Sequence, residues 1–106
     1  MRNSDERDNR NKFIKLNNKL GNLKMKSMPY SGWTNEAYNS VFVTPEVFKS
    51  LFGISIDRVK WVGSMCTSHA FSMNSYINVT NQYLTLGSPS MEKSSSYDFI
   101  ITIIHE

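Results

Sequence analysis

Residues 97–105 of this chain read YDFIITIIH, and this stretch decides the fold class more than any other. Apolar side chains stand at nearly every position, so both faces of a strand formed here would be apolar. Such a continuous run is typical of a strand that is covered on both sides. We therefore expect a central strand over these residues, with both of its faces buried.

The best-marked helix covers residues 45–52. Thr44 is a typical N-cap residue, and Pro45 suits the first helical position because its missing N–H would have no helical partner. Gly53 is a natural stop. One stripe of the helix is apolar and predicts packing on a sheet; it consists of Val47, Phe48, Leu51 and Phe52.

Strand-forming residues dominate the chain after the helix. Apolar runs over 54–65, 70–79 and 83–86 are separated by turn-forming residues, and a serine-rich loop covers 87–96. Together with the helix, these runs predict an α+β fold. We expect a four- or five-stranded antiparallel sheet, packed by one main helix at about residues 45–52 and preceded by a basic N-terminal arm.

The positive charge is concentrated in the N-terminal quarter of the sequence. Residues 1–26 hold eight Lys and Arg against three acids, whereas residues 27–106 hold four against six. Residues 1–12 have no apolar side chain after Met1, so they gain little by burial and are expected to form a flexible polar tail. Residues 13–106 are expected to form a single domain.

Residues 13–28 fit two different structures. Helical spacing is followed by four apolar residues: Phe13, Leu16, Leu20 and Leu23. Against a helix, the segment is rich in Asn and Gly, which are poor helix formers. Strands over 13–16 and 23–28 with a turn between them would make a basic hairpin instead. We favour the hairpin slightly, and the choice decides where the lysines point.

The basic segment predicts contact with nucleic acid or another polyanion. No acid occurs between Arg10 and Lys26, and cations in this segment would neutralise phosphates with release of counterions. Two aromatic residues follow the segment and would stack on bases if exposed. The candidate nucleic-acid-binding residues are Arg10, Lys12, Lys15, Lys19, Lys24, Lys26, Tyr30 and Trp33.

Residues 61–91 contain no Asp, Glu, Lys or Arg. Interface cores are depleted in charge and enriched in aromatic residues and Met, and an uncharged sheet edge can pair with another chain. The stretch therefore predicts a protein partner or a homo-oligomer. The candidate interface residues are Trp61, Phe71, Met73, Tyr76 and Tyr83.

The sequence contains no pattern that indicates a reaction. Cys66 and His69 would point to opposite faces of an alternating strand, and no glycine-rich phosphate loop is present. One cysteine and two histidines do not supply a standard structural zinc site. We expect no catalytic residue, no metal, no cofactor and no small-molecule substrate.

These observations predict a small non-enzymatic binding protein. It would self-associate through an uncharged β-rich surface and contact nucleic acid or a nucleoprotein through its basic N-terminal segment. The alternative is a small phage- or virus-type inhibitor or adaptor that binds and occludes a host protein. With one cysteine and no apolar run of membrane-spanning length, we expect a cytoplasmic protein without membrane contact.

Overall fold

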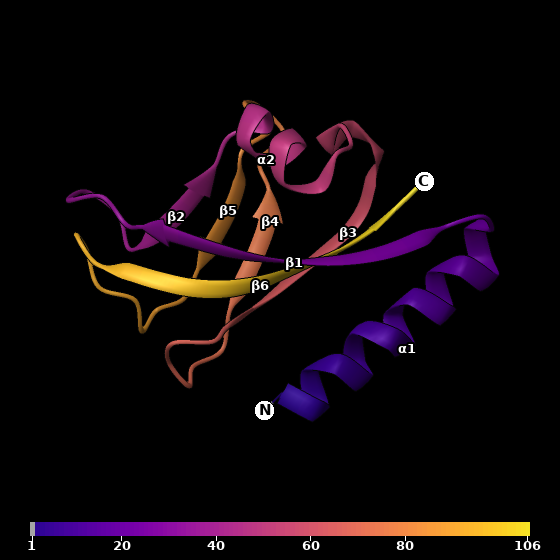
Figure 1. Cartoon of the computed structure of the whole chain (residues 1–106), viewed down its shortest axis with the longest axis horizontal. Coiled ribbons are helices and arrows are strands. Elements are labelled where there is room, and N and C mark those ends of the chain that lie inside the picture. The colour runs from indigo at the N-terminus through magenta and orange to yellow at the C-terminus, as the bar shows by residue number, and fades with distance from the viewer. Residues whose placement is uncertain (1) are drawn as a thin grey trace.

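The computed structural model describes residues 2–106, with side chains from Glu6 onward, and has an α+β fold as predicted (Figure 1). Its regular elements, in chain order, are α1 (Arg2–Leu20), β1 (Lys24–Trp33), β2 (Ser40–Val43), α2 (Pro45–Phe52), the short 3₁₀ helix η1 (Ile56–Arg58), β3 (Val59–Cys66), β4 (Asn74–Ile77), β5 (Leu84–Gly87) and β6 (Ser96–His105). Met1 lies outside the described residues.

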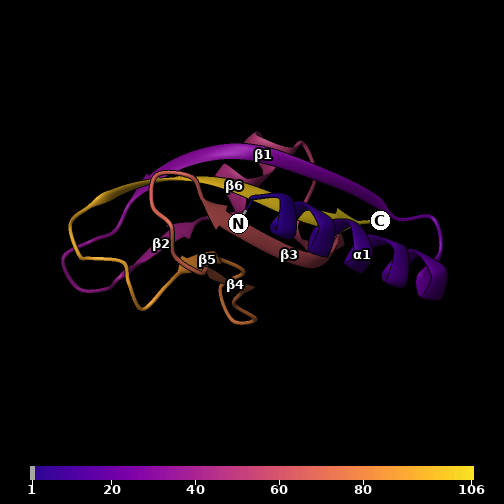
Figure 2. The ribbon, with the colours of Figure 1, turned by 90° about the horizontal axis from the view of Figure 1, so that it is seen from below.

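The strands form two antiparallel sheets of three strands each. Sheet A has the order β1-β6-β3, and sheet B has the order β2-β5-β4. Figure 2 shows β2, β5 and β4 grouped on one side of sheet A. The expected single sheet of four or five strands, packed by one main helix, is therefore wrong. The prediction of a central strand is confirmed, because β6 is the middle strand of sheet A.

The hydrophobic core explains why a second sheet is needed. Every second residue of β6 points into the core, which also contains Leu84 and Leu86 of β5. A ten-residue strand is about 34 Å long, whereas an eight-residue helix spans only about 12 Å. Because α2 cannot cover the inner face of β6, sheet B covers most of it instead.

Helix α2 forms as its sequence predicts. The Thr44 hydroxyl accepts a hydrogen bond from the Val47 N–H at 3.2 Å, and Gly53 ends the helix in the left-handed conformation at φ +77°. Phe48 and Phe52 are buried in the core with their rings 4.7 Å apart. Val47, which we expected in the buried stripe, is exposed.

The N-terminal segment is helical up to Leu20, and β1 begins at Lys24. The hairpin with a strand over 13–16 is therefore wrong, and residues 2–12, expected as a flexible tail, belong to the same helix. The segment is rich in residues that form helices poorly, but local hydrogen bonds satisfy backbone groups at the C-terminal end of α1. Gly21, at φ +75°, donates its N–H to the Asn17 carbonyl at 2.8 Å, and the Asn17 side chain accepts from the Leu23 N–H at 3.0 Å.

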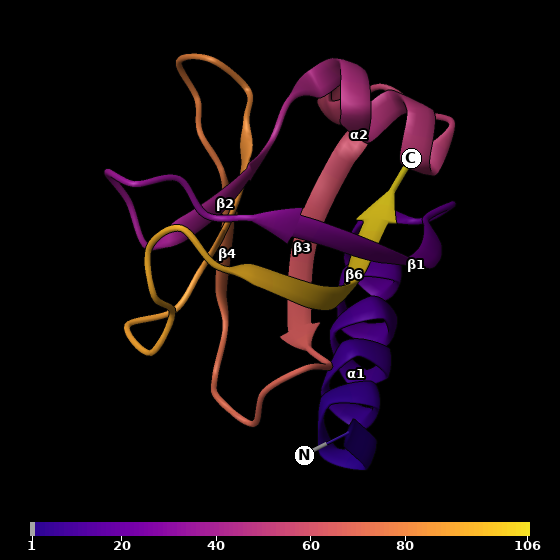
Figure 3. The same ribbon diagram turned by 60° about the vertical axis from the view of Figure 1, so that its left-hand side comes forward.

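Helix α1 lies against the face of sheet A that is turned away from sheet B. The Asn9 amide donates to the Thr102 hydroxyl at 3.3 Å, and that hydroxyl shares a 2.8 Å hydrogen bond with Ser27 of β1. Thr102 alternates with the core residues Ile101 and Ile103, so its side chain leaves the opposite face of β6. In Figures 1 to 3, α1 stands at the end of the molecule away from β2, β4 and β5.

Candidate binding surfaces

Three lysines lie on one side of α1. Lys12, Lys15 and Lys19 are three and four residues apart, the spacing that places side chains on one side of a helix. Among residues 6–106, the only ion pair joins the Lys60 ammonium to a Glu106 carboxylate oxygen at 3.6 Å. No acid with a described side chain therefore pairs with these three lysines, which we call the lysine side of α1.

The other predicted cations lie elsewhere. Arg10 is on the opposite flank of α1, where it borders a hollow of about 350 Å³ together with Met25 and Thr102. The Lys26 ammonium donates to the Phe52 carbonyl at 2.9 Å, at the C-terminal end of α2. Lys26 and Ser27 alternate along β1, so Lys26 leaves the sheet on the core side, away from α1. Lys24 is exposed at the start of β1.

The two predicted stacking residues differ in accessibility. Tyr30 is half-buried and packs against the hydrophobic core. Trp33, at the last position of β1, is 71% exposed. Of these two rings, Trp33 is therefore the one with a face open to a ligand.

The uncharged stretch divides between the two sheets. Its first part forms most of β3 in sheet A, and its later part forms β4 and β5 in sheet B. The Trp61 ring lies across Gly63, where an added Cβ would come within 2.5 Å of it. Gly63 pairs with Thr102, whose hydroxyl bonds to Asn9 of α1. Trp61 and Gly63 therefore lie on the side of sheet A that faces α1.

The five predicted interface residues do not form one surface. Trp61 faces α1, whereas Phe71 and Met73 pack against the core. Tyr83 is half-buried just before β5. Only Tyr76 is exposed, at 49%, on the outer face of sheet B.

The outer face of sheet B carries an aromatic row that crosses all three strands. The register places Phe42 opposite Thr85, and Thr85 opposite Tyr76. Phe42 is 37% exposed, and Tyr38 meets its ring edge-on at 5.8 Å. Beside this row, Gly87 lies between two polar residues of the neighbouring strands, Ser40 and Asn74.

A hollow of about 250 Å³ opens over the row formed by Ser40, Gly87 and Asn74. It is lined only by uncharged residues, among them Asn39, Asn74, Tyr76, Thr85 and Gly87. Phe42 and Tyr38 were not predicted as interface residues because they lie outside the uncharged stretch, residues 61–91. The alternation of 41–43 contained a usable signal: with two valines buried, the phenylalanine between them must face outward.

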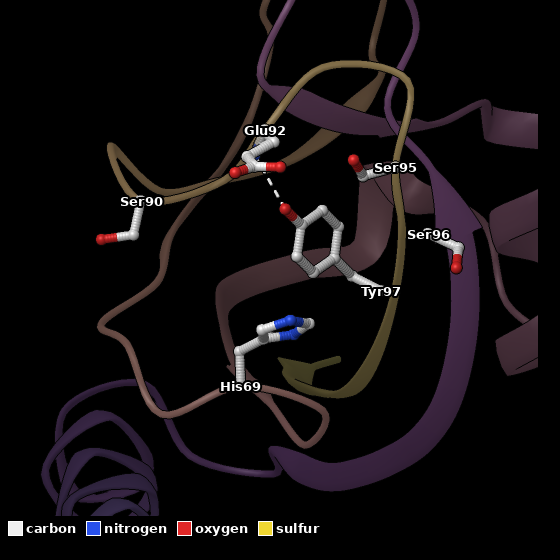
Figure 4. A pocket seen from close by; sticks show the side chains of 6 residues that line it. All are labelled: His69, Ser90, Glu92, Ser95, Ser96 and Tyr97. Carbon is white, nitrogen blue, oxygen red and sulfur yellow. Dashed lines mark hydrogen bonds between the residues drawn. The ribbon is translucent and has the colours of Figure 1, made fainter.

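A third hollow, of about 200 Å³, lies beside Tyr97 (Figure 4). The Tyr97 hydroxyl accepts the Glu92 N–H at 2.7 Å, and the His69 ring lies 4.9 Å from the Tyr97 ring. His69 shares a 3.0 Å hydrogen bond with Ser68, whose hydroxyl also accepts from the Asp98 N–H. These bonds join both loops, residues 67–73 and 88–95, to the start of β6, which favours a structural role for this cluster.

The Cys66 thiol is fully buried and reaches the Ser68 hydroxyl at 3.4 Å rather than the imidazole of His69. In the part of the chain that the structure describes, no three His, Cys, Asp or Glu side chains are grouped so that they could hold a metal ion. No helix within residues 2–106 is long and apolar enough to cross a membrane.

Comparison with protein families, with curated proteins and with solved structures finds no match to this chain.

Proposed function

We propose that this chain is a small, non-enzymatic, cytoplasmic binding protein that associates with nucleic acid or a nucleoprotein through the lysine side of α1. The observation that supports this most is the alignment of Lys12, Lys15 and Lys19, with no described acid paired to any of them. Arg10 adds a fourth cation on the same helix, and no acid occurs in residues 9–20.

The dimensions of the lysine side suit a phosphate backbone. Lys19 follows Lys12 by seven positions, which corresponds to about 10 Å along a helix. Phosphates follow one another about every 3.4 Å along one strand of a duplex, so this length matches about three phosphates. Neutralising them releases counterions, and the affinity then depends strongly on salt.

The test measures binding of a single-stranded oligonucleotide at increasing salt. For three phosphates on a single strand we expect a log–log slope of about −2, which gives about a twenty-fold loss of affinity between about 50 mM and 200 mM salt. A triple variant, K12Q/K15Q/K19Q, should remove most of the binding and flatten this slope.

The chain offers a matched control, because it has three lysines outside its N-terminal quarter: Lys49, Lys60 and Lys93. The variant K49Q/K60Q/K93Q loses the same charge but keeps the lysine side of α1. If both triple variants weaken binding equally, the attraction is due to net charge and not to α1. If the intact protein does not bind at low salt, the proposed function is wrong.

A protein-directed role is the second candidate. In this alternative the chain self-associates, or occludes a host protein as a small phage- or virus-type inhibitor or adaptor. The observation that favours it is Val79, an apolar side chain that is 96% exposed in the turn between β4 and β5. The molar mass in solution tests self-association: a monomer at all concentrations would contradict it, whereas a mass that falls in a V79S variant would support it.

A further inference from the structure

The outer face of sheet B combines exposed aromatic rings with a floor of small residues. Thr85 and Gly87 stand on the middle strand, and they are flanked on the outer strands by Phe42 and Tyr76 in one row and by Ser40 and Asn74 in the next. Outer strands of a three-stranded sheet are about 10 Å apart. Because Gly87 has no side chain, the hollow lies over it and beside the Tyr76 ring.

The groups around this hollow suit a flat, uncharged ligand. All the lining residues are uncharged, so ionic attraction does not select the ligand. The Asn74 amide makes no hydrogen bond to any residue from 6 to 106, and an amide can both donate and accept. The half-exposed Tyr76 ring offers a π face. An aromatic face next to a free amide matches a nucleobase, which has a π face and an edge of donors and acceptors.

A protein partner fits this face less well. Three strands of four residues cover about 13 Å by 10 Å, which is about 130 Å² of sheet. A stable protein interface buries about 800 Å² on each partner. A second copy, or any other folded protein, would therefore need much more contact area than the face of sheet B provides.

We infer that the outer face of sheet B binds one unpaired nucleobase, stacked on Tyr76 above Gly87, with its edge hydrogen-bonded to Asn74. The inference rests on the proposed function and deepens it, because it makes the nucleic acid single-stranded. Bases in a duplex are stacked on each other and do not offer a free face. The lysine side of α1 and sheet B lie towards opposite ends of a domain 41 Å long, so the two sites bind different nucleotides of one strand (Figure 1).

The experiment compares two single strands with the same number of phosphates, a thymidine oligonucleotide and its abasic counterpart, at one low salt concentration. A length of roughly 16 nucleotides matches the largest sites of single-strand-binding domains. We expect the full chain to bind the thymidine strand at least about five-fold more tightly than the abasic strand, since stacking of one base contributes about 1 kcal/mol or more.

Variants assign this preference to a surface. Y76L should abolish the preference while leaving the affinity for the abasic strand unchanged. V47S should keep the preference, because Val47 is an exposed apolar residue on α2, outside sheet B and outside α1. K12Q/K15Q/K19Q should lower the affinity for the thymidine strand and for the abasic strand by the same factor. If Y76L keeps the preference, or if V47S abolishes it to the same extent as Y76L, the inference is overturned.

A second measurement needs no variant and no phosphate. Titration of the isotope-labelled full chain with free thymidine should shift the backbone amide signals of Asn74, Thr85 and Gly87, and leave those of α1 in place. An unchanged spectrum, together with equal affinity for the thymidine and abasic strands, overturns the inference while the proposed function stands. A molar mass that halves in Y76L would assign the face to a second copy and would also overturn it.

Failure of the proposed function gives a different pattern. In that case neither oligonucleotide binds at low salt. The titration with free thymidine still tests the outer face of sheet B independently. Shifts at Asn74, Thr85 and Gly87 would then leave a base-binding face on a protein that has no phosphate site.

Discussion

Sheets A and B each have three antiparallel strands, yet they differ in what covers their outer faces. The strands of sheet A have eight to ten residues, and α1 lies against its outer face. Each strand of sheet B has four residues, and no helix or strand within residues 2–106 lies on its outer face. The two middle strands offer an exact comparison. Thr102 of β6 and Thr85 of β5 both face outward and are 3% and 4% exposed.

The difference between these threonines separates a structural face from an accessible one. The Thr102 hydroxyl is hydrogen-bonded to both Asn9 and Ser27. The Thr85 hydroxyl makes no hydrogen bond to any residue from 6 to 106, and its neighbours in the row are two partly exposed aromatic rings. Sheet A uses both of its faces for packing, whereas sheet B uses one face for the core and leaves two aromatic rings partly exposed on the other.

The largest expected effect compares a phenylalanine from each sheet. Phe99 of β6 is fully buried in the core, so F99A should lower the free energy of unfolding by about 3–5 kcal/mol. Phe42 on the outer face of sheet B is partly exposed, so F42A should cost about 1 kcal/mol or less. Urea unfolding of both variants measures the difference. Equal losses would mean that the outer face of sheet B is as tightly packed as the core.

A smaller effect compares the two threonines directly. T102V removes a buried hydroxyl and leaves Asn9 and Ser27 without their shared partner, so it should cost about 1–3 kcal/mol. T85V removes a hydroxyl that bonds to no described residue, and it should change stability by less than about 0.5 kcal/mol. Hydrogen exchange adds a local measurement: in T102V, the amides of α1 should exchange faster. Unchanged exchange would mean that Thr102 does not hold α1 in place.

The elements whose structure is set by neighbouring residues in the sequence could be predicted. Thr44, Pro45 and Gly53 act within a few residues of each other and define α2. The apolar run over 97–105 indicates a strand buried on both faces, whatever its partners are. The division into two sheets could not be predicted in this way, since an inward residue of β3 such as Val62 resembles an inward residue of β5 such as Leu84.

The N-terminal helix was less predictable because side-chain hydrogen bonds offset its poor composition. Asn17 counts against a helix by propensity, but here its side chain accepts a hydrogen bond from Leu23 just beyond the helix end. The lysine side of α1 follows from helical spacing once the helix is chosen. The separation of Lys26 from it depends on the contact with α2, which is distant in sequence.

The aromatic row on sheet B could not be predicted from the sequence either, because it also depends on contacts between residues distant in sequence. Phe42, Tyr76 and Thr85 come from three strands, and only the pairing register brings them into one line. A one-residue shift of either outer strand would turn its aromatic side chain into the core. The charge-free stretch pointed towards Tyr76 but contained neither Phe42 nor Tyr38.

Trp61, stretched across Gly63 on the side of sheet A that faces α1, gives the protein an internal optical probe. The sequence has one other tryptophan, Trp33, near the opposite end of β6. In a W33F background, the wavelength of indole emission would follow the surroundings of Trp61 alone. Lifting of the N-terminal helix could then be followed in real time, without any attached dye, as an oligonucleotide is added.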